Sequence, residues 1–164
     1  MDQEIIDCGT LLMDKKLTLA FAESATAGYL SSQFSLVHHA GKFLKGGLVC
    51  YDAELKKSIL HVPEGLIETF TPESAEVTNA MCQGLCQLIP ADIHVAVTGL
   101  TCPGGSETSE KPVGTIFIVG LMQGQKLFAK RIYLQGDEQQ IIQDTAKQVA
   151  LLISDALQSA ELLE

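Results

Sequence analysis

The 164-residue sequence contains no tryptophan, and only 5% of its residues are aromatic. Positive charge is also scarce, because 11 lysines and arginines stand against 20 aspartates and glutamates, a formal net charge of −9. An acidic surface repels phosphate backbones, so we expect no nucleic-acid partner. A phosphorylated small molecule would have to be bound by local hydrogen-bond donors rather than by a basic field.

Long apolar runs are missing too. No stretch approaches the roughly 18 apolar residues that span a bilayer, so we expect no membrane partner. The acidic opening MDQEIID (1–7) lacks the basic region of a secretory signal. The five cysteines are odd in number and lack the dense pairing of a secreted scaffold. We therefore expect a cytoplasmic protein with reduced thiols.

Hydrophobic residues, at 46% of the chain, are sufficient for one core. Their spacing predicts strands that alternate with helices, followed by a hairpin at Gln123-Gly124-Gln125. This order predicts an α/β fold, a three-layer-like sandwich with a mixed β-sheet flanked by helices, as a single domain over residues 1–164. The expected helices cover residues 3–14, 26–36, a short stretch from 52, 71–90 and 137–160, and the expected strands cover 17–22, 43–51, 92–99, 113–122 and 126–134.

The helix expected from residue 71 has a distinct start signal. Thr71 would cap the helix, and Pro72 would occupy its first position, where a missing N–H costs nothing. Apolar residues then recur at three- and four-residue spacing as far as Leu88, and Pro90 ends the pattern. The sequence therefore predicts one long amphipathic helix here.

Ligands of α/β proteins usually bind where strands end and turns lead into helices. The first such turn is ESATAG (23–28), which opens a helix with small hydroxyl residues. Backbone N–H groups at a helix start attract anions, which makes Ser24, Thr26 and Gly28 candidate ligand-binding residues. The alternative is an ordinary helix cap, since serine and threonine are common caps.

The second strand exit places Tyr51 and Lys56 about one helical turn apart. A lysine beside a phenol can act as a general base or as a charge clamp, so this pair is the candidate catalytic pair. The alternative is a lysine that is simply exposed to solvent on the helix surface, as most lysines are.

The third exit is the long loop VTGLTCPGGSETSEKPVGT (97–115). Thr98 and Gly99 end a strand, Gly104 and Gly105 would let the backbone approach a ligand closely, and Lys111 precedes the return to the sheet. The glycine spacing does not match a phosphate-binding Walker A loop. The alternative is a surface loop of turn residues.

Metal and cofactor signals are weak. Cys82 and Cys86 lie four residues apart but on the apolar side of a helix, where cysteine behaves as a small hydrophobe. Adjacent His38 and His39 are poorly placed to chelate one ion. We therefore expect no metal and no cofactor. A catalytic pairing of one of the other cysteines, Cys50 or Cys102, with a histidine stays open.

Together, the three segments resemble the C-terminal domain of the CinA (competence/damage-inducible) family. ESATAG is similar to the family's ESCTGG turn, GGLVCYDAELKKSIL (46–60) to its GG-x-V-x-Y-(S/D)-N-x-x-K segment, and TGLTCPGGSETSEKPVGT (98–115) to its TGIAGPGG…EKPVGT loop. The resemblance implies a homo-oligomer that binds a small nucleotide and acts as a nicotinamide-nucleotide amidohydrolase. Such enzymes convert nicotinamide mononucleotide to nicotinate mononucleotide and ammonia.

Two positions depart from the family pattern. By the same resemblance, the family's nucleophilic serine in a GSS segment aligns with Gly41, and the arginine of its GDR motif aligns with Glu138. Glycine cannot attack an amide, and glutamate would repel a phosphate. One hypothesis is an amidohydrolase in which Ser24, Thr26 or Ser58 replaces the nucleophile. The second is a catalytically degenerate paralogue that binds a pyridine or other small nucleotide without turnover, and the third is an interaction module.

Overall fold

A computed structural model describes the backbone of residues 2–161 and the side chains of residues 2–159. Residues 1 and 162–164 of the expected domain lie outside the described residues. Five strands form one sheet in the order β2-β1-β3-β4-β5, with β1 parallel to β2 and β3, and the remaining pairs antiparallel. The predicted mixed sheet is confirmed. The strands are β1 (Leu19–Glu23), β2 (Leu44–Val49), β3 (Ile93–Gly99), β4 (Thr115–Met122) and β5 (Gln125–Tyr133).

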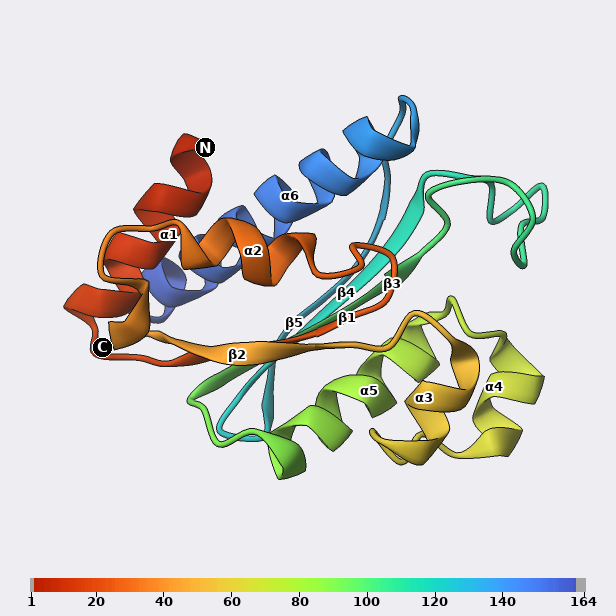
Figure 1. The fold of residues 1–164 in the computed structure, drawn as a ribbon, viewed down its shortest axis with the longest axis horizontal. Coiled ribbons are helices and arrows are strands. Elements are labelled where there is room, and N and C mark those ends of the chain that lie inside the picture. Colours follow the sequence, from red (N-terminus) through yellow and green to blue (C-terminus); the bar gives the residue numbers. More distant parts are fainter. Residues whose placement is uncertain (1, 162–164) are drawn as a thin grey trace.

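The helices cover both faces of the sheet, which confirms the predicted sandwich (Figure 1). Three of them, α1 (Gln3–Asp14), α2 (Tyr29–Ser35) and α6 (Glu138–Glu161), lie on one face. The other three, α3 (Ala53–Ser58), α4 (Glu64–Phe70) and α5 (Ala75–Leu88), lie on the opposite face. A short 3₁₀ helix, η1 (Ala40–Lys42), precedes β2. Within residues 2–161, no helix combines the length and the apolar character that a membrane span requires.

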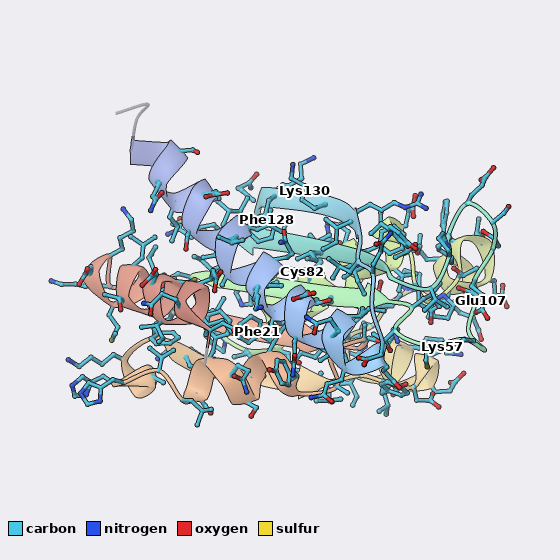
Figure 2. The ribbon with its side chains drawn as sticks, turned by 90° about the horizontal axis from the view of Figure 1, so that it is seen from above. Phe21, Lys57, Cys82, Glu107, Phe128 and Lys130 are labelled. Carbon is cyan, nitrogen blue, oxygen red and sulfur yellow. The ribbon has the colours of Figure 1, made fainter. Side chains whose placement is uncertain are left out.

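Each face of the sheet has its own core, because side chains alternate between the faces of a strand. In β1, Leu19 and Phe21 point into the core under α1, α2 and α6, and Ala20 and Ala22 point into the core under α5. Phe21 also packs against Phe34 of α2, with ring centroids 5.0 Å apart. The small alanines leave room for α5 to lie close to the sheet. Figure 2 shows Phe21 and Cys82 in the interior of the molecule.

The predicted helix start at Thr71-Pro72 is wrong. Thr71 instead ends α4, a helix that the sequence analysis did not expect, and its backbone is left-handed (φ 70°). The following helix, α5, begins at Ala75, and the Ser74 hydroxyl caps it by accepting a hydrogen bond from the Val77 N–H (3.3 Å). A serine three residues further on therefore provides the cap that was assigned to the threonine.

Two other boundaries follow from left-handed backbone. The helix expected over residues 26–36 begins only at Tyr29, because Ala27 (φ 46°) and Gly28 (φ 95°) are both left-handed and cannot continue a helix. The predicted hairpin is confirmed. Its turn is formed by Gln123 (φ 50°) and Gly124 (φ 78°), and two positive φ values are typical of the tight turns that fit twisted strands.

Candidate functional site

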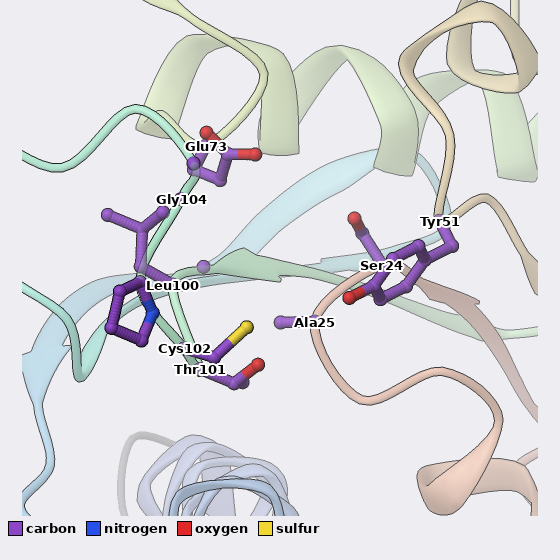
Figure 3. A pocket seen from close by; sticks show the side chains of 11 residues that line it. Ser24, Ala25, Tyr51, Glu73, Leu100, Thr101, Cys102 and Gly104 are labelled. Carbon is purple, nitrogen blue, oxygen red and sulfur yellow. The ribbon is translucent and has the colours of Figure 1, made fainter. Parts of the chain in front are cut away.

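A pocket of about 230 Å³ lies at the edge of the sheet where the parallel strands β1 and β3 end. This is the position that α/β folds commonly use for ligands. Figure 3 shows Ser24 and Tyr51 on one side of the pocket, with Leu100, Thr101 and Cys102 of the long loop on the other. The lining residues are Ser24, Ala25, Tyr51, Glu73 and residues 99–105. All three predicted strand exits thus contribute residues to one pocket.

A buried carboxylate holds the turn after β1 in place. The Glu23 side chain is fully buried and accepts five hydrogen bonds from the residues that follow it. Its Oε2 accepts from Thr26 Oγ1 (2.7 Å) and from the N–H groups of Gly28 and Leu30 (both 3.0 Å), and its Oε1 accepts from the N–H (2.8 Å) and the Oγ (2.6 Å) of Ser31. Thr26 and Gly28 were predicted to bind a ligand, but neither lines the pocket. Both shape the turn that carries Ser24.

Replacing this carboxylate should destabilise the fold. In Glu23→Gln, the amide NH₂ would face donors that now meet an oxygen, and buried donors would lose their acceptor. We expect the free energy of unfolding to fall by about 3 kcal/mol, since hydrogen bonds to charged groups are worth more than neutral ones. Urea denaturation measures this, with the exposed Glu68→Gln as the matched control. A loss no larger than the control's would contradict the role given to Glu23.

Ser24 and Lys56 are in direct contact. Lys56, on α3, is buried, and its Nζ donates hydrogen bonds to Ser24 Oγ (3.0 Å) and to the Cys50 carbonyl (3.0 Å). Burial lowers the pKa of Lys56, although the nearby Glu73 carboxylate acts in the opposite direction. A lysine with a lowered pKa can lose its proton and act as a base towards the hydroxyl beside it.

Tyr51 does not form the predicted pair with Lys56. Its side chain lines the pocket and is 61% exposed, whereas Lys56 points inward, and no hydrogen bond joins the two within the described chain. The helix between them begins at Asp52, whose side chain accepts the Glu54 N–H (2.7 Å). This cap sets the direction of α3, so that the lysine turns under the sheet edge and the tyrosine stays at the surface.

The long loop contributes backbone to the pocket. Gly99, Gly104 and Gly105, which were predicted to bind a ligand, line the pocket, and Gly104 has a left-handed backbone (φ 103°) that favours glycine. Thr98 does not line it, because this side chain is fully buried and its Oγ1 lies 2.8 Å from the Thr78 hydroxyl of α5. The predicted ligand contact of Thr98 is therefore replaced by a contact between the sheet and α5.

Lys111 holds the long loop against the segment that joins α4 and α5. Its Nζ donates hydrogen bonds to Thr71 Oγ1 (2.6 Å), Ser106 Oγ (2.7 Å) and the Glu73 carbonyl (3.0 Å). Burial lowers the pKa of Lys111. Lys111 was predicted to bind a ligand, but it does not line the pocket. Its bond to the Glu73 carbonyl instead helps to hold Glu73, which does line the pocket.

Position 41 is far from the pocket. Gly41 lies in η1, directly before β2, and β2 runs parallel to β1 with Leu44 paired to Leu19. Ser24 follows the other end of β1, so Gly41 and the pocket lie at opposite ends of the sheet. A Cβ added at Gly41 would meet no atom within 4 Å apart from its chain neighbours. Within one chain, the residue at this position therefore lies too far from the pocket to supply its nucleophile.

Glu138, the second departure from the family pattern, does adjoin the pocket. It is the first residue of α6, and its Oε1 accepts a hydrogen bond from Thr101 Oγ1 (3.4 Å) in the pocket wall. Glu73 is not among the predicted site residues, because it comes from a bend between two helices rather than from a strand exit. Thr101 is a second pocket residue without a predicted role. Only the fold brings these residues together.

Neither a cysteine–histidine pair nor a metal-binding group occurs in the part of the chain that the structure describes. Cys102 lines the pocket, but no histidine does, and no three histidine, cysteine, aspartate or glutamate side chains come together. All five cysteines are free. Ser24, Thr101 and Cys102 are the lining residues with an aliphatic hydroxyl or a thiol, and of these three Ser24 is the one in contact with a lysine.

Sequence comparison identifies relatives of the chain. The model of the CinA C-terminal domain matches residues 3–157. A CinA-like protein from Dictyoglomus thermophilum is 38% identical over 141 residues, which cover 86% of this chain and 33% of that protein. A CinA-like protein from Thermotoga maritima is 46% identical over 108 residues, which cover 66% of this chain and 26% of that protein. The chain thus spans about a third or less of the length of these relatives.

Solved structures agree with the sequence comparison. Competence damage-inducible protein A from Klebsiella pneumoniae has a TM-score of 0.87 at 25% identity, with 93% of this chain and 96% of that chain covered. A CinA superfamily protein from Escherichia coli has a TM-score of 0.85 at 25% identity, with 93% of this chain and 91% of that chain covered. The domain match over most of the chain, the sequence relatives and the shared fold show that this chain belongs to the CinA C-terminal domain family.

Proposed function

We propose that the chain hydrolyses the carboxamide of a small substrate of the nicotinamide-nucleotide type and releases ammonia, with Ser24 as the nucleophile and Lys56 as the base. The observation that carries this proposal is the 3.0 Å contact between Lys56 Nζ and Ser24 Oγ at the pocket. A serine activated by a lysine is a recurrent solution to acyl transfer. Family membership supports the substrate type.

The reaction uses one proton acceptor twice. Neutral Lys56 takes the proton of Ser24 Oγ as the oxygen attacks the amide carbon, and a tetrahedral intermediate forms. The C–N bond then breaks, and Lys56 returns the proton to the leaving ammonia. Water attacks the acylated Ser24 with Lys56 again as the base, which releases the carboxylic acid and restores the serine.

Donors for the developing oxyanion are available beside the nucleophile. The N–H groups of Ala25 and Thr26 follow Ser24 directly and make no hydrogen bond within the described chain. Backbone N–H groups in this position stabilise the negative oxygen of a tetrahedral intermediate. Tyr51, exposed beside Ser24, offers its ring and hydroxyl to the substrate. These residues complete an acyl-transfer site.

Binding without turnover is the second candidate, and it is less well supported. That hypothesis rests mainly on the absence of a side chain at Gly41, a position that lies at the opposite end of the sheet from the pocket. The other departure, Glu138, concerns the charge that a ligand meets rather than the attacking group. Hydrolysis therefore accounts better for a serine held by a buried lysine.

The test is ammonia release from nicotinamide mononucleotide and from nicotinamide riboside, measured over hours at high protein concentration by an enzyme-coupled assay. The proposal predicts release above that of heat-denatured protein from at least one of the two compounds. If either compound binds but neither releases ammonia, the binding-only hypothesis is favoured instead.

A further inference from the structure

Two acidic side chains lie at the pocket. Glu73 lines the pocket, and Glu138 accepts a hydrogen bond from Thr101 in its wall. The Glu73 carboxylate accepts a hydrogen bond from Ser106 Oγ (2.5 Å), and neither carboxylate forms an ion pair among the described residues. A bound ligand therefore meets the Glu73 carboxylate directly and has the Glu138 carboxylate next to Thr101 of the pocket wall.

The nearby cations are already engaged. Lys56 donates hydrogen bonds to Ser24 and to a backbone carbonyl, and the proposed reaction requires its amine to be uncharged. Lys111 makes three hydrogen bonds to the loop and the α4–α5 segment. Arg131 donates to the Glu110 carbonyl and lines a separate cavity. Among the described residues, no lysine or arginine lines the pocket itself.

A carboxylate of the long loop itself accepts a hydrogen bond from the glycine segment of that loop. The Gly104 N–H donates to Glu107 Oε1 (2.8 Å), and backbone N–H bonds, that from Gly104 foremost, lower the pKa of the Glu107 carboxyl. Backbone N–H groups of glycine loops are the donors that bind phosphate in other nucleotide sites. Here the Glu107 carboxylate takes the place of the phosphate, at the loop end of the molecule (Figure 2).

We propose that the pocket selects an unphosphorylated N-substituted pyridinium carboxamide, a cation of the nicotinamide riboside type, over its phosphate ester. This inference rests on the proposed function and names its substrate class. Glu73 and Glu138 attract the positive ring, and the exposed Tyr51 ring offers a face on which a cation binds well. A phosphate group would meet the same two carboxylates, and Glu107 would compete for the N–H groups that could hold it.

The experiment compares kcat/KM for nicotinamide riboside and nicotinamide mononucleotide at low ionic strength. We expect the riboside to be preferred at least about tenfold, and the preference to shrink as salt screens the carboxylates. Glu138→Arg should raise the relative kcat/KM of the mononucleotide about tenfold. Asp155→Arg makes the same charge change on α6, about 25 Å further along the helix at 1.5 Å per residue, and should leave the ratio unchanged. Equal use or preference for the mononucleotide would overturn the inference.

The two proposals fail in different ways. If neither compound releases ammonia, the proposed function is wrong. Charge selection is then tested by binding. The measured quantity is the concentration of each compound that protects the pocket thiol Cys102 from iodoacetamide, in a Cys86→Ala background. Protection by the riboside at the lower concentration would sustain the inference. Protection by the mononucleotide at an equal or lower concentration, or by neither compound, would overturn it.

Discussion

Ser24→Ala is expected to lower kcat for ammonia release by at least about 10³-fold, because it removes the attacking oxygen of a covalent mechanism. Among the described residues, the hydroxyl forms a hydrogen bond with one side chain, Lys56, so its loss should leave the fold intact. Activity is measured as ammonia release, and folding is checked by circular dichroism and urea denaturation.

Ser58→Ala is the matched control for this variant. Ser58 is exposed on α3, and its hydroxyl only donates to the Glu54 carbonyl (2.9 Å) within the helix. We expect its kcat to stay within about twofold of the unmodified protein. Full activity in the folded Ser24→Ala variant would show that another group attacks the amide.

Lys56→Met is expected to lower kcat by about 10² to 10⁴-fold, the usual contribution of a general base. In the unmodified protein, only the neutral amine can take the serine proton. The rate should therefore rise with pH and level off above the pKa of Lys56, which burial holds below its ordinary value. The methionine variant should lose this rise.

The pH dependence of folding stability gives an independent measure of the Lys56 pKa. Unfolding returns Lys56 to its ordinary, higher pKa, so the unfolded chain binds more protons between the two pKa values. The free energy of unfolding should accordingly rise with pH across that window, and Lys56→Met should flatten the rise. Lys57→Met, the neighbouring lysine paired with Glu54 and Glu64, is the control and should keep it. A pH dependence unaffected by Lys56→Met would contradict the lowered pKa.

The layers and the sheet were predictable because their signals are local. Alternating small and large apolar residues in LTLAFA (17–22) define a strand buried on both faces, and the Gln123-Gly124 turn connects two clear strands. The break at Thr71 was not predictable from a capping pattern alone, since Ser74 satisfies the same pattern three residues later. Helix boundaries here depend on which of two competing caps the tertiary packing uses.

The site was predicted only where it depends on short segments. Ser24, Tyr51 and the loop glycines do line one pocket, because parallel strands end at one edge of the sheet. The contact of Lys56 with Ser24 joins residues 32 positions apart, and no spacing rule selects it. Thr98 and Lys111 have residue types that suit ligand binding, but hydrogen bonds within the protein use them instead.

Covalent labelling tests the central claim most directly. The purified protein is treated with phenylmethanesulfonyl fluoride, which sulfonylates activated serines, and the site of modification is mapped by peptide mass spectrometry. We predict one adduct on Ser24 that is absent from Lys56→Met and present in Lys57→Met. An adduct on another residue, or none on Ser24 in protein that releases ammonia, would contradict the claim that Lys56 activates Ser24.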